Sequence, residues 1–258
     1  MIGVINNKLT ENIEIEKWKT KGMLYEVIRV IKGKPLFLNE HLNRLKNIAI
    51  DADTEVLKES IKILIKSIDI NISQNIFLSY DPVNGANIVF FTKSFYPPEK
   101  WFDEGVDIGL LEIKRDNPNL KIYNDEYKSK VESYLKDNNY FETLIAHDNI
   151  VTEGSRSNVF FIKENTIITT PIVDVLPGIT RDKVIYVLNK LGMEILEKEI
   201  LISELQSYDG CFITGTSIDV LPVRKLQDIS YETGRNEVYK KVDKEFEKVK
   251  EADLNDYA

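Results

Sequence analysis

Apolar and polar positions along the first part of the chain alternate at the periods of short strands and amphipathic helices. The run from Met23 to Phe37 alternates with a period of two and is interrupted at Gly33, a pattern that predicts a β-hairpin with a glycine turn. Helices are expected to begin at Asn39 and at Asp53 or Thr54, because these polar side chains can cap a first turn that apolar residues then follow at helical spacing.

The same patterns continue to the C-terminus. Runs rich in β-branched and aromatic residues, separated by turn-forming residues, predict further strands, and apolar residues recurring every three to four positions predict further helices. The predicted elements are strands over 75–80 and 87–92, a helix over 126–138, a hairpin of 142–146 with 150–152, strands over 158–162 and 166–169, a helix capped by Thr180 and ended by Gly192, and an amphipathic helix over 238–249.

A polar segment over 113–124, which contains Asn117-Pro118-Asn119, separates the two sets of elements. Such a segment is typical of a connection between domains. The sequence therefore predicts an α/β (α+β) protein of two domains: residues 1–114 form an N-terminal α/β domain, residues 115–124 a connection, and residues 125–258 a C-terminal α/β domain.

Charge and composition narrow the functional classes. With 42 acidic residues against 34 basic ones the net charge is −8, which opposes binding to a nucleic acid backbone. No segment approaches the ~18 consecutive apolar residues of a membrane-spanning helix, so no membrane association is expected. A single cysteine, Cys211, lies in an apolar stretch and is expected in the core, which is consistent with a cytoplasmic protein.

Histidine is scarce. With only His41 and His147 the chain cannot supply a multi-histidine metal site, so no metal is expected, and both side chains are expected to be solvated or to cap an element.

Three kinds of group between Lys121 and Ser217 match the needs of pyridoxal phosphate. An aldehyde cofactor requires a sheltered lysine to hold it as a Schiff base, and Lys121 is the candidate. The ring nitrogen must stay protonated beside a carboxylate, and Glu153 ends a predicted strand immediately before Gly154. A phosphate is bound by amides at a helix N-terminus, and Gly178-Ile179-Thr180 and Gly215-Thr216-Ser217 both suit that purpose. Arg44 is a candidate for the additional positive charge.

With these residues in place, the chain resembles the class IV aminotransferases, the fold-type IV enzymes that include branched-chain and D-amino-acid aminotransferases and aminodeoxychorismate lyase. The resemblance runs from Tyr25-Glu-Val-Ile-Arg29 and Glu40-His-Leu-Asn-Arg-Leu45 to Leu221-Pro222-Val223. It implies two α/β domains with the cofactor between them, in a homodimer. It also implies a role for each candidate: Lys121 forms the Schiff base, Glu153 contacts the pyridine nitrogen, Leu176 packs on the ring, Asn124 lies near the Schiff base, Tyr25 lines the substrate side, and Arg44, Ile179, Thr180 and Thr216 bind the phosphate.

Departures from the family pattern leave the substrate open. The Arg-x-His carboxylate trap of D-amino-acid aminotransferases is absent from the segment 90–94, and Val27 replaces the glycine of branched-chain aminotransferases. The substrate carboxylate is therefore expected to meet the backbone near Ser217 and Ile218, with help from Tyr25. The leading hypothesis is a transfer of an amino group between an α-amino acid and a 2-oxo acid. Elimination of pyruvate from aminodeoxychorismate on the same site is the alternative, and a non-catalytic binding protein is a third.

Overall fold

A computed structural model describes residues 1–67 and 73–257 and divides the chain into two compact units. The first unit comprises residues 1–95, 120–125 and 250–258, and the second comprises residues 96–119 and 126–249. The bounds of these units differ from those of the expected domains at three places. Residues 96–119 group with the second unit, and residues 120–125 and the last residues of the chain group with the first.

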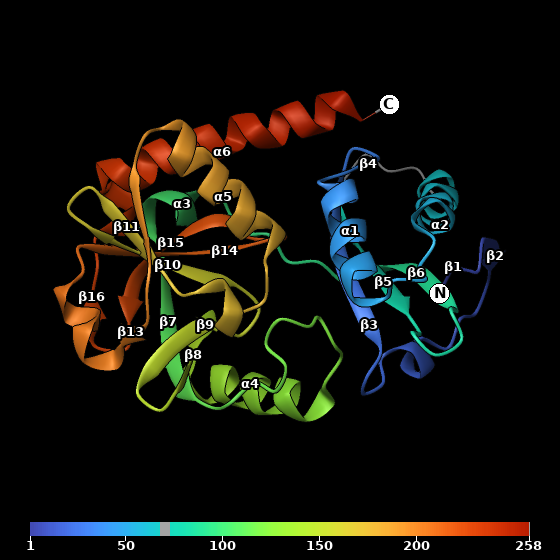
Figure 1. Cartoon of the computed structure of the whole chain (residues 1–258), viewed down its shortest axis with the longest axis horizontal. Helices are drawn as coiled ribbons and strands as arrows, with labels where there is room; N and C mark the ends of the chain where they lie inside the picture. The colour runs from blue at the N-terminus through green and yellow to red at the C-terminus, as the bar shows by residue number, and fades with distance from the viewer. Residues whose placement is uncertain (68–72, 258) are drawn as a thin grey trace. The chain divides into compact units, whose positions relative to one another are not determined.

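The first unit consists of one β-sheet and the helices that pack on it (Figure 1). Its sheet has the strand order β2-β1-β6-β5-β3-β4, and every neighbouring pair is antiparallel. The elements are β1 (Gly3–Ile5), β2 (Lys8–Thr10), the 3-10 helix η1 (Ile15–Trp18), β3 (Leu24–Ile31), β4 (Lys34–Pro35), α1 (Leu38–Ile48), α2 (Thr54–Lys66), β5 (Gln74–Tyr80) and β6 (Asn87–Thr92).

Helices α1 and α2 pack on one face of this sheet. Their apolar residues join Leu24, Ile28 and Val30 of β3 in one buried cluster, because alternate residues of a strand point to the same face. The predicted hairpin and the predicted start of α2 are confirmed, since the Asp53 side chain accepts hydrogen bonds from the amides of Glu55 and Val56.

The predicted cap of α1 at Asn39 is wrong. The helix begins at Leu38, and its N-cap is Phe37, whose backbone is left-handed with φ of 52°. The Phe37 amide donates to the Asp253 carboxylate at 2.7 Å. A residue from the C-terminal end of the chain therefore supports the start of α1, and sequence near Asn39 carries no sign of it.

The other face of the same sheet is aromatic. Phe77 of β5 and Phe90 of β6 form a cluster with Tyr123, and Tyr25 of β3 packs against it. The Tyr25 and Phe77 rings are stacked, with centroids 5.3 Å apart and an angle of 11° between the ring planes. This face carries the lysine described below.

The second unit contains a larger mixed sheet with the order β12-β11-β10-β14-β15-β7-β8-β9-β13, and β16 pairs with β15 (Figure 1). Pairs β11–β12, β15–β7 and β7–β8 are parallel. The elements that lie wholly or mainly in this unit are α3 (Lys100–Glu104), β7 (Val106–Glu112), α4 (Asp125–Asn138), β8 (Glu142–His147), β9 (Ile150–Gly154), β10 (Asn158–Lys163), β11 (Thr166–Thr169), η2 (Ile172–Asp174), α5 (Ile179–Lys190), β12 (Glu194–Glu197), β13 (Ile200–Leu201), η3 (Ile202–Ser207), β14 (Gly210–Gly215), β15 (Asp219–Leu226), β16 (Ile229–Ser230), η4 (Thr233–Arg235) and α6 (Glu237–Asp256).

Buried side chains cover both faces of the central strands of this sheet. Cys211 is fully buried in one apolar cluster, as the sequence predicts. On the opposite face Phe160 and Phe212 stack at 5.1 Å, and Tyr239 of α6 lies next to Phe212. Among the described residues no helix is both long enough and apolar enough to cross a membrane.

The helix predicted to be capped by Thr180 does form, but its N-cap is Gly178 and Thr180 lies in its first turn. Gly192 follows its C-terminal end with φ of 64°, a backbone conformation that favours glycine. The predicted hairpin of β8 with β9 and the strands β10 and β11 are also confirmed.

Candidate functional site

Lys121 lies on a short segment that extends the sheet of the first unit. The Tyr25 amide donates to the Lys121 carbonyl at 3.0 Å, and the Tyr123 amide donates to the Met23 carbonyl at 2.9 Å. Residues 121–123 thus run beside the start of β3 and are not an unstructured connection. The half-buried Lys121 side chain places its Nζ atom 4.7 Å from the centroid of the Tyr25 ring. Asn124, one residue past this pairing, is also half-buried.

Arg44 is held by an acid that sequence analysis did not single out. Its Nε and Nη2 atoms donate to the two carboxylate oxygens of Glu26 at 2.8 and 2.6 Å. Nδ1 of His41 lies 2.8 Å from the same carboxylate, and His41 is 1% exposed. The expectation of a solvated or capping His41 is therefore wrong, because Glu26 gives its ring a partner inside the unit.

In the buried group of Glu26, Arg44 and His41, the charge of the Glu26 carboxylate is paired with that of the Arg44 guanidinium. Burial acts to raise the pKa of Glu26, but the Arg44 guanidinium and the His41 hydrogen bond outweigh it and lower the pKa to about 2. Burial also lowers the pKa of His41, against the opposing effect of Glu26. Glu26 is consequently an anion that fixes Arg44 on α1.

Glu153 occupies the second unit, on β9, and is 3% exposed. Its Oε2 atom accepts a hydrogen bond from the Leu176 amide at 3.0 Å, and its Oε1 atom forms an ion pair with the Arg115 guanidinium. A carboxylate buried with these two donors is held as an anion in one orientation. Glu153 also belongs to a larger hydrogen-bonded network, because Leu176, whose amide binds Glu153, is hydrogen-bonded through its carbonyl as well.

Asn158 completes that arrangement. Its Nδ2 atom donates to the Leu176 carbonyl at 2.9 Å, and a Cβ atom added to Gly178 would lie only 2.0 Å from its Oδ1 atom. The chain therefore passes Asn158 so closely that any side chain at position 178 would displace the Asn158 amide group. Asn158 is paired with Thr214 across β10 and β14, so the segment before α5 and the end of β14 are neighbours.

Groups that suit a phosphate gather at this end of β10 and β14. The N-terminus of α5 receives no side-chain cap within the described chain, and the amides of a helix start bind anions. The buried Thr214 hydroxyl has no hydrogen-bond partner among the residues that the structure describes. The turn from Gly215 contains Thr216 and Ser217, both half-buried, and it closes with a hydrogen bond from the Ile218 amide to the Gly215 carbonyl at 3.1 Å. The Ile218 amide is therefore already hydrogen-bonded within the turn.

Each candidate from the sequence falls within one unit or the other. The first unit holds Lys121, Arg44, Tyr25 and Asn124, and the second holds Glu153, Leu176, Ile179, Thr180, Thr216, Ser217 and Ile218. Sequence analysis missed three residues that hold the candidates in place: Glu26, Arg115 and Asn158. Of these three, only Glu26 could have been recognised from the sequence, because it is a carboxylate at an inward-facing position of a strand with alternating apolar residues.

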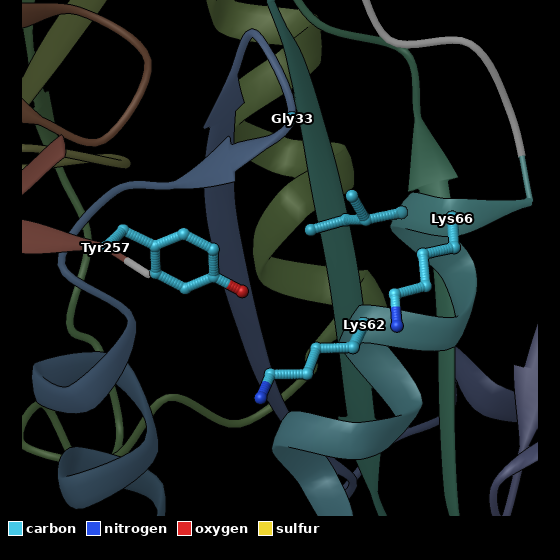
Figure 2. Close-up of a pocket in the computed structure, with 5 residues that line it drawn as sticks. Gly33, Lys62, Lys66 and Tyr257 are labelled. Atoms are coloured by element: carbon cyan, nitrogen blue, oxygen red, sulfur yellow. The ribbon is translucent and has the colours of Figure 1, made fainter. Parts of the chain in front are cut away.

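A separate hollow of about 290 Å³ lies in the first unit (Figure 2). Its lining contains none of the candidate residues, and so it is not the predicted cofactor site. The residues that line it are Gly33, Lys62, Ile65, Lys66 and Tyr257. Over residues 1–67 and 73–257, no group of three or more His, Cys, Asp or Glu side chains is arranged to hold a metal ion.

Comparison with known proteins identifies the relatives of this chain. The model of the family described as amino-transferase class IV matches residues 23–226. A D-alanine aminotransferase of Bacillus licheniformis is 29% identical over 233 residues, and the match covers 83% of this chain and 82% of that protein. A putative branched-chain amino acid aminotransferase of Thermotoga maritima has the same fold, with a TM-score of 0.83, 24% identity, and coverage of 96% of this chain and 94% of that one. A putative 4-amino-4-deoxychorismate lyase of Legionella pneumophila also shares the fold, with a TM-score of 0.81, 22% identity, and coverage of 95% and 98%.

Proposed function

The chain belongs to the class IV aminotransferases, and we propose that it transfers an amino group between an α-amino acid and a 2-oxo acid with Lys121 as the residue that carries the chemistry. The enzymes of this family depend on pyridoxal phosphate. The observation that carries the assignment is the buried Glu153 carboxylate, held by Arg115 and the Leu176 amide near an uncapped helix start. An anion beside amide donors is the combination that a phosphorylated pyridinium requires.

The residues present fit this cofactor. Donors for the phosphate are available at the uncapped N-terminus of α5, which has Ile179 and Thr180 in its first turn, and at the adjacent turn at Thr216. The buried Thr214 hydroxyl nearby can donate a further hydrogen bond. We assign the remaining positive charge to Arg44, which Glu26 holds on α1. Leu176 is assigned to the face of the ring, since its backbone is tied on both sides to Glu153 and Asn158.

The chemical roles follow from these positions. When bound, pyridoxal phosphate supplies an electron sink that weakens the bond between Cα of the amino acid and its hydrogen. Nζ of Lys121 is the base that takes this proton, and its half-buried position beside the Tyr25 ring limits its hydration. Glu153 keeps the pyridine nitrogen protonated, because an ionised carboxylate favours the charged form of a neighbouring base.

The substrate is assigned to groups near these residues. We propose that Tyr25 and the Thr216–Ser217 turn meet the α-carboxylate, and that Asn124 lies near the amino group being transferred. The Ile218 amide is not assigned as a donor, because it is bound to Gly215.

Aminodeoxychorismate lyase is the second candidate function. Lys121 and Asn124, three residues apart, are equally suited to a site that eliminates pyruvate, and the shared fold of the Legionella protein is consistent with it. The two functions differ in the shape of the substrate pocket, so substrate turnover decides between them.

Replacing Lys121 tests the assignment directly. We expect the purified protein to be yellow, and Lys121→Ala to lose the visible absorption band and at least about 100-fold of its amino-transfer rate, since the covalent attachment and the base are removed together. The substrates to be measured are a panel of D- and L-amino acids and aminodeoxychorismate.

Lys128→Ala and Lys130→Ala are the matched controls, because both lysines lie on α4 close to Lys121 in sequence. Each is expected to keep the band and the activity. Loss of the band in either control, with the band kept in Lys121→Ala, would mean that another lysine holds the cofactor. Release of pyruvate from aminodeoxychorismate without amino transfer would establish the lyase.

We also propose that the enzyme is a homodimer that works in the cytoplasm. The dimer is supported by the family resemblance, and the compartment by the single buried thiol, Cys211, which forms no disulfide within the chain.

A further inference from the structure

The aromatic face of the first unit carries a second lysine, besides Lys121. Nζ of Lys19 lies 5.3 Å from the centroid of Phe77 and 5.4 Å from the centroid of Phe90. Phe77 in turn stacks on Tyr25, whose ring lies beneath Lys121. The two ammonium groups therefore border one continuous row of aromatic rings.

Lys19 differs from Lys17, which lies two positions earlier. Lys17 is 71% exposed and forms an ion pair with Glu14 at 2.6 Å. Lys19 is half-buried, and within the described part of the chain it forms no ion pair. A cation that rests on ring faces is partly removed from water, so it attracts an anion more strongly than a fully solvated one does.

The stem of a lysine often covers apolar surface while its ammonium reaches water, and this role alone would account for the contact with the rings. The position relative to Lys121 adds a second role. Two stacked rings, Tyr25 and Phe77, lie between the two ammonium groups. An anion bound at Lys19 would therefore belong to a part of the substrate distant from the carbon that reacts at Lys121.

We propose that Lys19 binds a distal carboxylate of the substrate, and that this enzyme prefers amino acids or 2-oxo acids whose second acidic group is separated from Cα by a long apolar chain or ring. The proposal rests on the proposed function, because it takes the reacting carbon to lie at Lys121. The apolar middle of such a substrate would lie along Tyr25 and Phe77. Lys19 acts on substrate preference and takes no part in proton transfer.

Three variants test this role in the enzyme loaded with its cofactor. Lys19→Met keeps an unbranched stem over the rings and removes the charge, Lys19→Arg keeps the charge, and Lys17→Met is the control from the same stretch. The substrates are aspartate, glutamate, 2-aminoadipate and 2-aminopimelate, each beside its side-chain amide, which is neutral and similar in size. Steady-state kinetics give kcat and KM for each.

We expect the wild-type protein to prefer the longer acids to their amides. Lys19→Met should lower kcat/KM for these acids by about 10- to 100-fold, mainly through KM, because one hydrogen bond to a charged group is lost. Its values for the amides should stay within about twofold of the wild type, Lys19→Arg should recover most of the loss, and Lys17→Met should match the wild type. An equal loss for acids and amides would overturn the proposal, because it would indicate a role in packing alone. So would a wild-type protein with no preference for acids.

Binding of unreactive ligands separates this proposal from the proposed function. Calorimetric titration with pimelate, compared with heptanoate of equal length, measures the distal anion site without any reaction. Pimelate binding that is lost in Lys19→Met would support the site even in a protein with no transaminase activity. Amino transfer from neutral amino acids, with no difference between pimelate and heptanoate, would refute the site and leave the proposed function standing.

Discussion

Glu26 is a carboxylate that is almost fully buried on the helix-covered side of β3, where the alternating pattern otherwise places apolar residues. Its two oxygens bind Arg44 and His41, and the cost of burying the charge is offset by these contacts. The pKa of Glu26 is lowered from 4.5 to about 2. Since the folded state favours the anion, the stabilisation is complete above the ordinary pKa and is lost as the pH falls through the folded one. It corresponds to about 3 kcal/mol.

Glu26→Gln is therefore expected to lower the free energy of unfolding at pH 7 by about 3–5 kcal/mol, because Arg44 is left buried without its anion. The fall in stability between pH 5 and pH 2 should also become shallower than in the wild type, since one titrating group with a lowered pKa is gone. Urea denaturation at pH 7, pH 5 and pH 2 measures both effects. Glu55→Gln removes an acid whose side chain is 78% exposed and should change neither result by more than about 1 kcal/mol. An unchanged acid limb in Glu26→Gln would contradict the assignment.

Glycines determine where helix α5 begins and where it ends. Its start depends on Gly178, because the chain passes within van der Waals contact of Asn158, which also holds the Leu176 carbonyl. Its end depends on Gly192, where φ is positive and an added Cβ atom would meet no other atom within 4 Å. The two glycines thus serve one helix for different reasons, and only the first lies beside the residues assigned to the cofactor.

Gly178→Ala is expected to displace Asn158 and shift the start of α5, which should weaken the binding of pyridoxal phosphate by about 10- to 100-fold. The same substitution should cost about 1–3 kcal/mol of stability through overpacking. Gly192→Ala is the matched control, because it strains the backbone at the other end of the helix and should cost stability without changing the dissociation constant of the cofactor. Titration of apoenzyme with pyridoxal phosphate, followed by absorption, gives that constant. If Gly178→Ala and Gly192→Ala both kept the cofactor affinity of the wild type, the start of α5 would not bind the phosphate.

At the scale of the whole chain, the compact units do not follow the linear order of the sequence. Residues 120–125 group with the first unit through their pairing with β3, and residues 250–258 group with it partly through Asp253, Leu254 and Tyr257. Lys34 donates to the Leu254 carbonyl at 2.8 Å, close to the contact between Asp253 and Phe37. The C-terminal residues therefore support the same corner of the first unit that begins α1.

The proposed homodimer is tested on the intact protein. Light scattering after size-exclusion chromatography should give twice the 29.8 kDa of one chain. The Tm should also rise with protein concentration, because dissociation is coupled to unfolding in such an assembly. A mass of one chain across a concentration range that includes micromolar protein, with a constant Tm, would refute the dimer.

The local pattern of residues determined most of the elements. The β3–β4 hairpin, the capped start of α2 and the strands β10 and β11 were all predicted, because hydrophobic periodicity, turn residues and capping act over a few neighbouring positions. Residue chemistry and order were also enough to propose Lys121, Glu153 and the phosphate-binding turns and to reveal the family. The family is confirmed by the match over residues 23–226, whereas the individual roles remain predictions.

Only the tertiary structure decided which partners these residues have. His41 was expected in solvent or as a cap and is instead buried against Glu26, 15 positions earlier. Glu153 is paired with Arg115, 38 positions earlier. The start of α1 was placed at Asn39, yet it begins after Phe37, which is held by Asp253 more than 200 positions away. Such contacts depend on how the strands and helices pack, and no short-range pattern records them. The sequence by itself therefore determined the elements and the chemistry available, and the packed chain determined which charges are buried together and which backbone turns are held in place.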